Sequence, residues 1–409
     1  MKPEFRVGVI GLGQRGMWHV NYILCERDDV EITAVCDTYA DRTAQAAKIC
    51  KDKRNWDVAQ TNDYRALIER DDVDVVLVFS AWENHVPAAV YAMNCGKQVA
   101  IEVGGAYSIA DCWSLVETYE KNRIHCMMLE NCCFDRNEMM AMRMVREGVF
   151  GKIVHCEGGY QHDLREEIAF GDENRHYRLR NYKNRCCENY PTHELGPIAK
   201  ILDINRGNRM VSLSSMASGA FGLNDYAEKN EKVNPELKTY RFNQGDIVKT
   251  NIKCARGELI TLTLDTTLPR NYSRNFTVRG TNGYFSENCD GIFLEGKSND
   301  WDHSFYGNIV EYREQYEHPV WKKYIEDGVK AGHGGMDWLI FDAYFSALKN
   351  GEYPPIDTYD TAAWMAISPL SEISIQQGGA PVDIPDFTHG MWTNRPENEK
   401  YTGFYQIDR

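Results

Sequence analysis

Short apolar runs alternate with amphipathic stretches along the first third of the chain. Strands are predicted at Phe5–Ile10, Glu31–Cys36, Asp74–Phe79, Gln98–Val103 and Ile124–Leu129. Helical spacing of apolar residues separates them, from Gln14 to about Cys25 and over Ala40–Cys50, Val86–Asn94 and Ile109–Asn122. The run Asp74–Phe79 is apolar on both faces, which is typical of a strand in a parallel sheet covered on both sides. The alternation predicts an α/β fold with a doubly wound parallel sheet of Rossmann type.

After Leu129 the rhythm changes. A helix is expected over Arg136–Glu147, and longer strands follow at Lys152–Tyr160, Asp246–Ala255, Leu259–Asp265, Asn275–Gly280 and Tyr284–Cys289. The turns ARGE (Ala255–Glu258) and GTNG (Gly280–Gly283) are hairpin signals. The pattern predicts an α+β part with an open, largely antiparallel sheet and helices on one face.

Two further segments complete this second part. Gln161–Arg185 is rich in Arg, Tyr and Asn and lacks periodicity, which favours a long functional loop. Helices are expected at Met336–Lys349 and Thr361–Gln376. We therefore expect a nucleotide-binding domain over residues 1–129 and a substrate-binding domain over 130–409.

Composition narrows the class of protein. The 409 residues are 43% hydrophobic and carry a formal net charge of −14, so a nucleic-acid surface and an anionic-membrane surface are both disfavoured. The apolar runs fall short of the ~18 residues that span a bilayer. Thirteen cysteines without a C-x-x-C pair indicate reduced thiols and no zinc site. Because no basic-then-apolar segment precedes the first strand, we expect a cytoplasmic location.

The glycine loop after the first strand predicts a dinucleotide site. Gly11-Leu12-Gly13-Gln14-Arg15-Gly16 follows a strand and opens a helix, and Asp37 ends the next strand about 20 residues further on. Glycines let the backbone approach a pyrophosphate, and the helix N-terminus stabilises its charge. A carboxylate at Asp37 accepts hydrogen bonds from ribose hydroxyls and repels a 2′-phosphate, which favours NAD over NADP. The nearby Arg42 favours NADP instead, because an arginine can accommodate a 2′-phosphate.

Two more segments are expected at the carboxyl ends of parallel strands, where such ligands bind. The first contains Trp82, Asn84 and His85, and the second contains Glu102 and Val103. Glu102 has an alternative interpretation as an acid that only closes the edge of the core.

The stretch CENYPTHELGP (Cys187–Pro197) places Tyr190 and His193 three residues apart, just ahead of an apolar run. It can be explained as a helix start with a proline in its first turn. It can also be explained as two proton-transfer groups that share a site, because histidine titrates near neutral pH.

Several longer motifs point to one family. The chain resembles the Gfo/Idh/MocA family over its full length, and within it glycoside hydrolase family 109, whose members are NAD-dependent α-N-acetylgalactosaminidases. The motifs are ENCCF (Glu130–Phe134), NYPTHELGP (Asn189–Pro197), LPRNYSRN (Leu268–Asn275), GHGGMD (Gly332–Asp337), YDTAAWMAISPLSE (Tyr359–Glu372) and APVDIPDFTHGMW (Ala380–Trp392).

Two departures separate the chain from the dehydrogenases of that superfamily. Those enzymes usually carry Glu-Lys-Pro where this chain has Glu102-Val103-Gly104, so the lysine is absent. They also carry an aspartate where this chain has Asn189. Both departures agree with the family 109 branch.

The resemblance implies a reaction without net oxidation. Sugar carbon 3 is transiently oxidised with NAD, the group on carbon 1 is eliminated after a proton leaves carbon 2, water adds, and hydride returns. His193 and Tyr190 are then the proton-transfer pair. Substrate contacts are expected from Arg178, Pro191, Thr192 and Tyr272, and Asn131 joins the cofactor contacts.

Other interpretations stay open on the sequence. An NAD-dependent sugar or inositol dehydrogenase would release NADH, and a non-catalytic NAD sensor would bind without turnover. The aromatic residues Trp301, Tyr306, Tyr312, Tyr316 and Trp321 could line a sugar cleft or form a subunit interface. We expect a small glycoside or sugar as the substrate, no metal, and a homo-oligomer.

Overall fold

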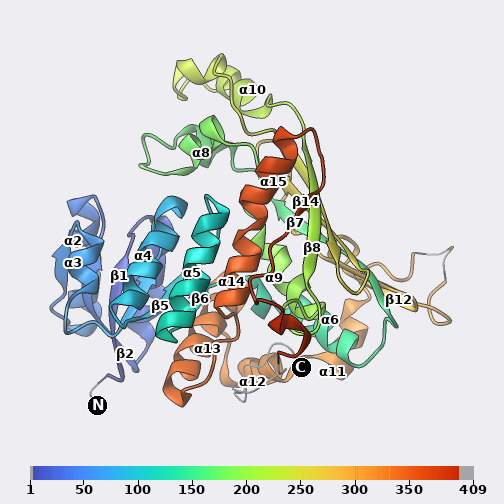
Figure 1. The fold of residues 1–409 in the computed structure, drawn as a ribbon, viewed down its shortest axis with the longest axis horizontal. Helices are drawn as coiled ribbons and strands as arrows, with labels where there is room; N and C mark the ends of the chain where they lie inside the picture. The colour runs from blue at the N-terminus through green and yellow to red at the C-terminus, as the bar shows by residue number, and fades with distance from the viewer. Residues whose placement is uncertain (1–2, 300, 302, 331, 396–409) are drawn as a thin grey trace. The chain divides into compact units, whose positions relative to one another are not determined.

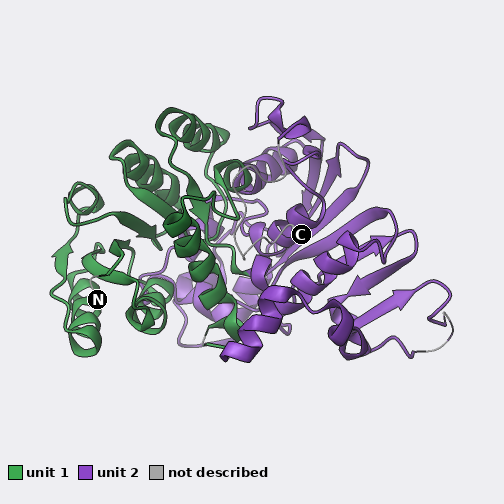
Figure 2. Cartoon of the chain, turned by 90° about the horizontal axis from the view of Figure 1, so that it is seen from below, with its two compact units in different colours: residues 1–131, 329–362 green, residues 132–328, 363–409 purple. Residues whose placement is uncertain are grey.

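The computed structural model describes residues 3–299, 301, 303–330 and 332–395, which form two compact units (Figures 1 and 2). Unit 1 comprises residues 1–131 and 329–362, and unit 2 comprises residues 132–328 and 363–409. The segment 329–362 therefore packs with the N-terminal part of the chain, although some 200 residues separate them.

Unit 1 is built on a six-stranded parallel sheet, which confirms the predicted Rossmann class. The strand order is β3-β2-β1-β4-β5-β6. The strands are β1 (Phe5–Ile10), β2 (Val30–Cys36), β3 (Ala59–Thr61), β4 (Val75–Val78), β5 (Gln98–Ile101) and β6 (Cys126–Met128). The order reverses between β1 and β4, and the crevice at such a switch point is where doubly wound sheets bind ligands.

The helices of unit 1 follow the predicted alternation. They are α1 (Gln14–Tyr22), α2 (Ala40–Arg54), α3 (Tyr64–Ile68), α4 (Trp82–Asn94), α5 (Ile109–Asn122) and α13 (Met336–Asn350), with α14 (Thr358–Met365) at the boundary of the unit. Local chemistry sets their ends. Ser108 and Asp111 form a reciprocal capping box that starts α5 at its predicted residue.

Unit 2 contains an eight-stranded sheet of order β13-β12-β11-β7-β10-β9-β8-β14, which confirms the expected second domain type. Every pairing is antiparallel except that of β7 with β10. The strands are β7 (Ile153–Gln161), β8 (Met210–Ala217), β9 (Ile247–Cys254), β10 (Leu259–Asp265), β11 (Thr277–Gly280), β12 (Gly283–Ser286), β13 (Gly291–Leu294) and β14 (Val382–Asp383). Residues of β9 alternate between buried and exposed, so the sheet has one covered face.

Helices of unit 2 pack on that sheet, with α9 against β7 and α15 against β8. The α-helices are α6 (Arg136–Arg146), α7 (Arg165–Ala169), α8 (Arg178–Asn184), α9 (Thr192–Ile201), α10 (Gly222–Lys229), α11 (Ile309–Tyr316), α12 (Pro319–Asp327) and α15 (Ile367–Gln376). Short 3-10 helices lie at Leu24–Glu26, Asn131–Phe134, Pro235–Lys238, Glu287–Cys289, His333–Gly335 and Met391–Thr393.

Three local predictions were wrong. The segment 161–185 is not one loop, because α7 and α8 lie within it; each is too short to show apolar periodicity. The single late helix over Thr361–Gln376 is two helices that break at Ala366, three residues before Pro369. Strand β8 was not predicted, since serines interrupt its apolar pattern.

The five late aromatic residues do not form one cluster. Trp321 and Tyr316 are buried, and the Trp321 indole donates a hydrogen bond to the carbonyl of Phe134. Trp301 and Tyr306 are exposed. Trp321 and Tyr316 therefore belong to the core of unit 2.

Candidate functional site

The glycine loop of unit 1 has the close backbone contacts that its sequence predicts. Gly11 has a φ of +91°, and an added Cβ would lie 2.4 Å from the Ser80 amide nitrogen. A Cβ on Gly16 would lie 2.0 Å from the carbonyl oxygen of Gly11. Gly13 differs, because a Cβ there would meet only the Arg42 guanidinium at 3.8 Å. Gly11 and Gly16 thus hold strand and helix together, and Gly13 leaves room beside the start of α1.

Asp37 lies at the end of β2 with its carboxylate turned toward the glycine loop. It accepts hydrogen bonds from the amides of Leu12 (2.7 Å) and Tyr39 (3.0 Å). Arg42 stands 3.8 Å from the same carboxylate and stacks on the Tyr39 ring. The open amides at the start of α1 and this carboxylate are the groups that a dinucleotide needs, so the residues present fit NAD.

Arg15 is the centre of an ion network in unit 1. Its guanidinium donates two hydrogen bonds to Asp337 (2.7 and 2.8 Å) and one to Glu102 (2.5 Å). The Asn131 side-chain amide donates a hydrogen bond to Asp337 at 2.7 Å, and Nδ1 of His333 lies 2.7 Å from the Asp337 carboxylate. Burial would raise the pKa of Glu102 and of Asp337, but Arg15 outweighs it and holds both pKa values below their ordinary range.

This network brings together three residues predicted at the cofactor site, namely Arg15, Glu102 and Asn131. It adds Asp337 and His333 from GHGGMD, to which the sequence analysis gave no role. His333 is a non-glycine residue with a φ of +43°, inside a turn whose glycines also have positive φ. The late segment therefore holds Arg15, the second residue of α1, in place.

Replacing Asp337 with asparagine should lower the free energy of unfolding by about 3 kcal/mol, because it removes a fully buried carboxylate that pairs with Arg15, whose side chain is 30% exposed. NAD affinity should fall with it, since Arg15 loses its fixed position. Thermal melts with and without NAD measure both effects. Asp342→Asn, on the same helix, is the matched control. It changes a carboxylate that is 30% exposed and pairs with the buried Arg27, and it should cost less than about 1 kcal/mol.

The remaining predicted cofactor residues differ in exposure. Trp82 is buried and opens α4, and Gly104 makes room for it, because a Cβ there would lie 2.4 Å from the indole. Val103 is buried and Asn84 is exposed. His85 is fully buried and lies 2.9 Å from the carbonyl oxygen of Ser80, which gives it a structural contact behind the site.

The predicted proton-transfer pair lies together in unit 2. The rings of Tyr190 and His193 are 4.8 Å apart and nearly perpendicular. The Arg178 guanidinium stands 5.1 Å from the Tyr190 ring and pairs with Glu167 at 2.6 Å. Arg178 thus presents a buried cation to a phenol that is next to an imidazole.

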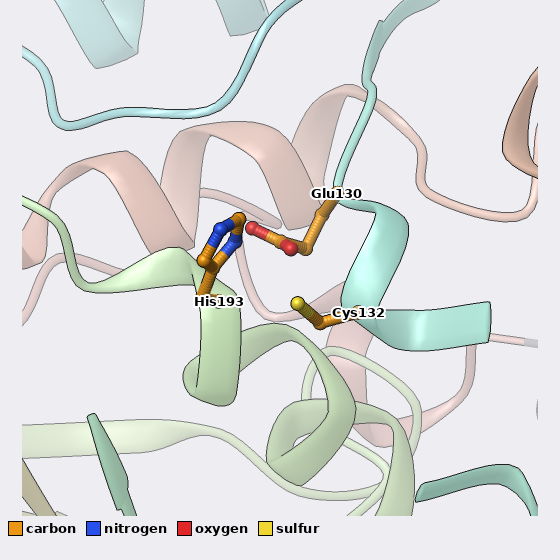
Figure 3. A group of neighbouring side chains, drawn as sticks. All are labelled: Glu130, Cys132 and His193. Carbon is orange, nitrogen blue, oxygen red and sulfur yellow. The ribbon is translucent and has the colours of Figure 1, made fainter. Parts of the chain in front are cut away.

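Three further groups lie in the same place. Tyr160, at the end of β7, has its ring 4.3 Å from that of Tyr190, and its hydroxyl lies 3.1 Å from the His162 ring nitrogen. Figure 3 shows the neighbouring side chains of Cys132 and His193. The thiol of Cys132 and a ring nitrogen of His193 lie within 4.8 Å of each other. Tyr160 and His162 could have been found from their i, i+2 spacing at a strand end, which puts both on one face.

Electrostatics separates the roles of these groups. Burial raises the pKa of Tyr160 to about 12, although Arg178 acts in the opposite sense. Burial, aided by Arg178, lowers the pKa of His162, so this ring is neutral at pH 7. Tyr160 therefore keeps its hydroxyl proton at pH 7 and can donate a hydrogen bond.

The other predicted substrate residues lie around the pair. Tyr272 is 48% exposed, and its ring is 5.2 Å from that of His162. Pro191 is the N-cap residue of α9, so the stretch is a helix start, and the role of Tyr190 and His193 as proton-transfer groups stays a prediction. Thr192 is fully buried.

Side chains hold the segment before α9 in its non-helical path. Gln244 donates to the carbonyl of Cys187 and accepts from Asn189. Ser371 accepts a hydrogen bond from the Glu188 amide. The backbone that leads into Tyr190 is thereby fixed from two other elements.

Glu188 is fully buried two residues before Tyr190, and burial raises its pKa to about 8. An acid whose pKa is higher in the folded than in the unfolded state destabilises the fold as pH rises between the two values. We expect this residue to cost about 4 kcal/mol between pH 5 and 8. Urea unfolding should show that Glu188→Gln removes this part of the pH dependence. The exposed Glu173→Gln should keep the wild-type profile.

Comparisons with known proteins identify a family model for each of two parts of the chain. Residues 5–129 match the model of an oxidoreductase family with an NAD-binding Rossmann fold. Residues 134–394 match the model of the glycosyl hydrolase 109 C-terminal domain. None of the helices in the described part of the chain combines the length and apolarity that a bilayer crossing needs.

Curated relatives align over most of their length. An α-N-acetylgalactosaminidase of Tannerella forsythia is 37% identical, with 95% of this chain and 87% of the relative covered. A glycosyl hydrolase family 109 protein of Parabacteroides distasonis is 38% identical, with 96% and 88% covered. Among solved structures, the myo-inositol dehydrogenase of Lactobacillus casei in complex with NAD(H) and myo-inositol shares the fold. Its TM-score is 0.61 at 16% identity, with 94% of this chain and 99% of that chain covered.

Proposed function

Because the chain belongs to glycosyl hydrolase family 109, we propose that it hydrolyses α-linked N-acetylgalactosaminides. The family makes the chain an NAD-dependent glycosidase. The observation that carries the proposal is the Tyr190–His193 pair beneath the Arg178 guanidinium. A glycosidase of this kind needs proton-transfer groups beside the sugar ring, and these residues supply them.

Bound NAD would supply reversible oxidation of sugar carbon 3, which acidifies the proton on carbon 2. The cofactor-binding residues would be Gly11, Gly13, Gln14, Gly16 and Asp37, with the Arg15 network behind them. His193 takes the carbon 2 proton, and the Tyr190 hydroxyl donates a hydrogen bond to a sugar oxygen. Arg178 and Tyr272 hold the substrate, and water completes the hydrolysis.

The alternative is an NAD-dependent dehydrogenase with net NADH formation. In this chain Glu102 is ionised and already engaged by Arg15 and His19, and the next residue is Val103, not lysine. Glu102 therefore has no adjacent lysine with which to relay a hydroxyl proton. This observation favours the glycosidase.

The test is an incubation with α- and β-nitrophenyl glycosides, including the N-acetylgalactosaminide. Nitrophenol and NADH are followed by absorbance in the same cuvette. We expect nitrophenol release from the α-N-acetylgalactosaminide without net NADH. NADH build-up without nitrophenol would replace the proposal with the dehydrogenase.

We also propose a cytoplasmic homo-oligomer. The thirteen cysteines form no disulfide bond within the described part of the chain, which suits a reducing compartment. Leu259 of β10 and Met216 of β8, with β9 between the two strands, expose apolar side chains on the same face of the sheet, and a second copy could cover them. Light scattering after size-exclusion chromatography measures the assembly, and a monomer mass would reject it.

A further inference from the structure

A buried ion cluster in unit 2 links three segments of the candidate site. The Arg274 side chain is 8% exposed and pairs with three carboxylates. Its Nη2 lies 3.0 Å from Asp135 and 2.9 Å from Glu138, and its Nε lies 3.2 Å from Glu194. We call these four residues the Arg274 cluster.

Each member of the cluster is close in sequence to a residue of the site. Glu194 directly follows His193 on α9, and Arg274 follows Tyr272 by two residues. Asp135 caps α6 and follows Cys132 by three residues. One guanidinium therefore connects the backbone segments that carry the imidazole, the half-exposed phenol and the thiol.

The cluster is fixed on both sides. The amides of Arg274 and Phe276 both donate to the Glu287 carboxylate, which anchors the loop after Tyr272. On the other side, a Cβ on Gly158 of β7 would lie 2.4 Å from the Cβ of Glu194. The strand thus carries a glycine where Glu194 passes it to reach the arginine.

The carboxyl groups around Arg274 explain why a lysine does not replace this arginine. Burial raises the pKa of Glu138 well above its ordinary value; Arg274 opposes this rise, and Asp135 and Glu194 add to it. Burial would also raise the pKa of Asp135, but Arg274 overcomes it and lowers it to about 2. Arg274 contacts these carboxylates from two nitrogens of one rigid plane, whereas an ammonium group has all its donors on a single nitrogen.

We propose that Arg274 is a positioning residue for the reaction, holding Tyr272 and His193 at a fixed separation through its pairs with Glu194 and Asp135. This inference rests on the proposed function for its kinetic consequence. Arg274 itself touches neither substrate nor cofactor in this role. Arg274 acts through the backbone segments to which Glu194 and Asp135 belong.

The test compares Arg274→Lys with Arg27→Lys, an equally buried arginine between Asp29 and Asp342 in unit 1. We expect Arg274→Lys to lower kcat about 30-fold at a temperature well below its Tm, with the Kd for NAD within twofold of wild type. Arg27→Lys should keep kcat. If Arg274→Lys does not fold, Glu194→Gln, which keeps the volume and removes one pair, should lower kcat about 10-fold.

Two readouts separate positioning from loss of stability. In the Tyr272→Phe variant, the further change Arg274→Lys should lower kcat by less than about threefold more. Both changes act on the contact that the Tyr272 phenol makes with the substrate. Histidine labelled with ¹³C at Cε1 should show a shifted His193 resonance in Arg274→Lys and Glu194→Gln, but not in Arg27→Lys. Wild-type kcat and an unshifted resonance in Glu194→Gln would overturn the inference. If the wild type cleaves no glycoside, only the proposed function is rejected. The His193 resonance then still tests whether Arg274 positions His193.

Discussion

His193→Ala should lower kcat for glycoside hydrolysis by about 1,000-fold or more, because it removes the imidazole that moves the carbon 2 proton. His193 is only partly buried and lies against Tyr190 and Tyr160, so the loss opens the site without leaving a large cavity. The Tm should change little. Steady-state kinetics with the nitrophenyl substrate and a thermal melt measure the two effects.

NAD binding by calorimetry is the internal control for this variant, since the residues that fit NAD lie in unit 1. His155→Ala is the matched substitution, because His155 is a partly buried histidine on β7 whose ring contacts Thr261. It should keep kcat within about threefold. A His193→Ala enzyme with wild-type kcat would remove His193 from the site.

Gly16→Ala should lower NAD affinity by about 1,000-fold. The new Cβ would lie 2.0 Å from the Gly11 carbonyl oxygen and 3.2 Å from the Phe79 side chain. A backbone oxygen cannot turn aside as the end of a side chain can, so the start of α1 must move from β1. The amides at this helix start then lose their place beneath a pyrophosphate. Calorimetric titration with NAD measures the loss, and a Tm lowered by several degrees should accompany it.

Gly13→Ala is the informative comparison. Its Cβ meets only Arg42 at 3.8 Å, so the fold should keep its Tm. NAD affinity should still fall, because the methyl group takes the space that the glycine leaves beside the helix start. Unchanged NAD affinity in both variants would show that the glycine loop does not hold the cofactor.

The sequence by itself determined the elements that depend on neighbouring residues. The helix Ile109–Asn122 and the strand Leu259–Asp265 have their predicted bounds. A capping box, an apolar period or a tight turn is complete within a few residues, so its signal is local. The glycine loop with Asp37 is equally local, because one strand–helix–strand unit contains all of it.

Pairings of residues far apart in the chain were decided by the tertiary structure. Asp337 meets Arg15 across 322 residues, and the segment 329–362 belongs to unit 1 for that reason among others. Arg274 meets Asp135 across 139 residues. Strand β8 pairs with β9 and β14, and its apolar pattern, interrupted by serines, does not predict these pairings.

The candidate site shows the same division. Tyr190 and His193 are three residues apart where α9 begins, so the sequence alone placed their rings together. The Arg178 cation and the Tyr160 ring reach Tyr190 from other elements, and Arg15 depresses the pKa of Asp337 against the effect of burial. Burial strengthens each of these interactions because water no longer screens them, and the sequence gives the groups without giving their surroundings.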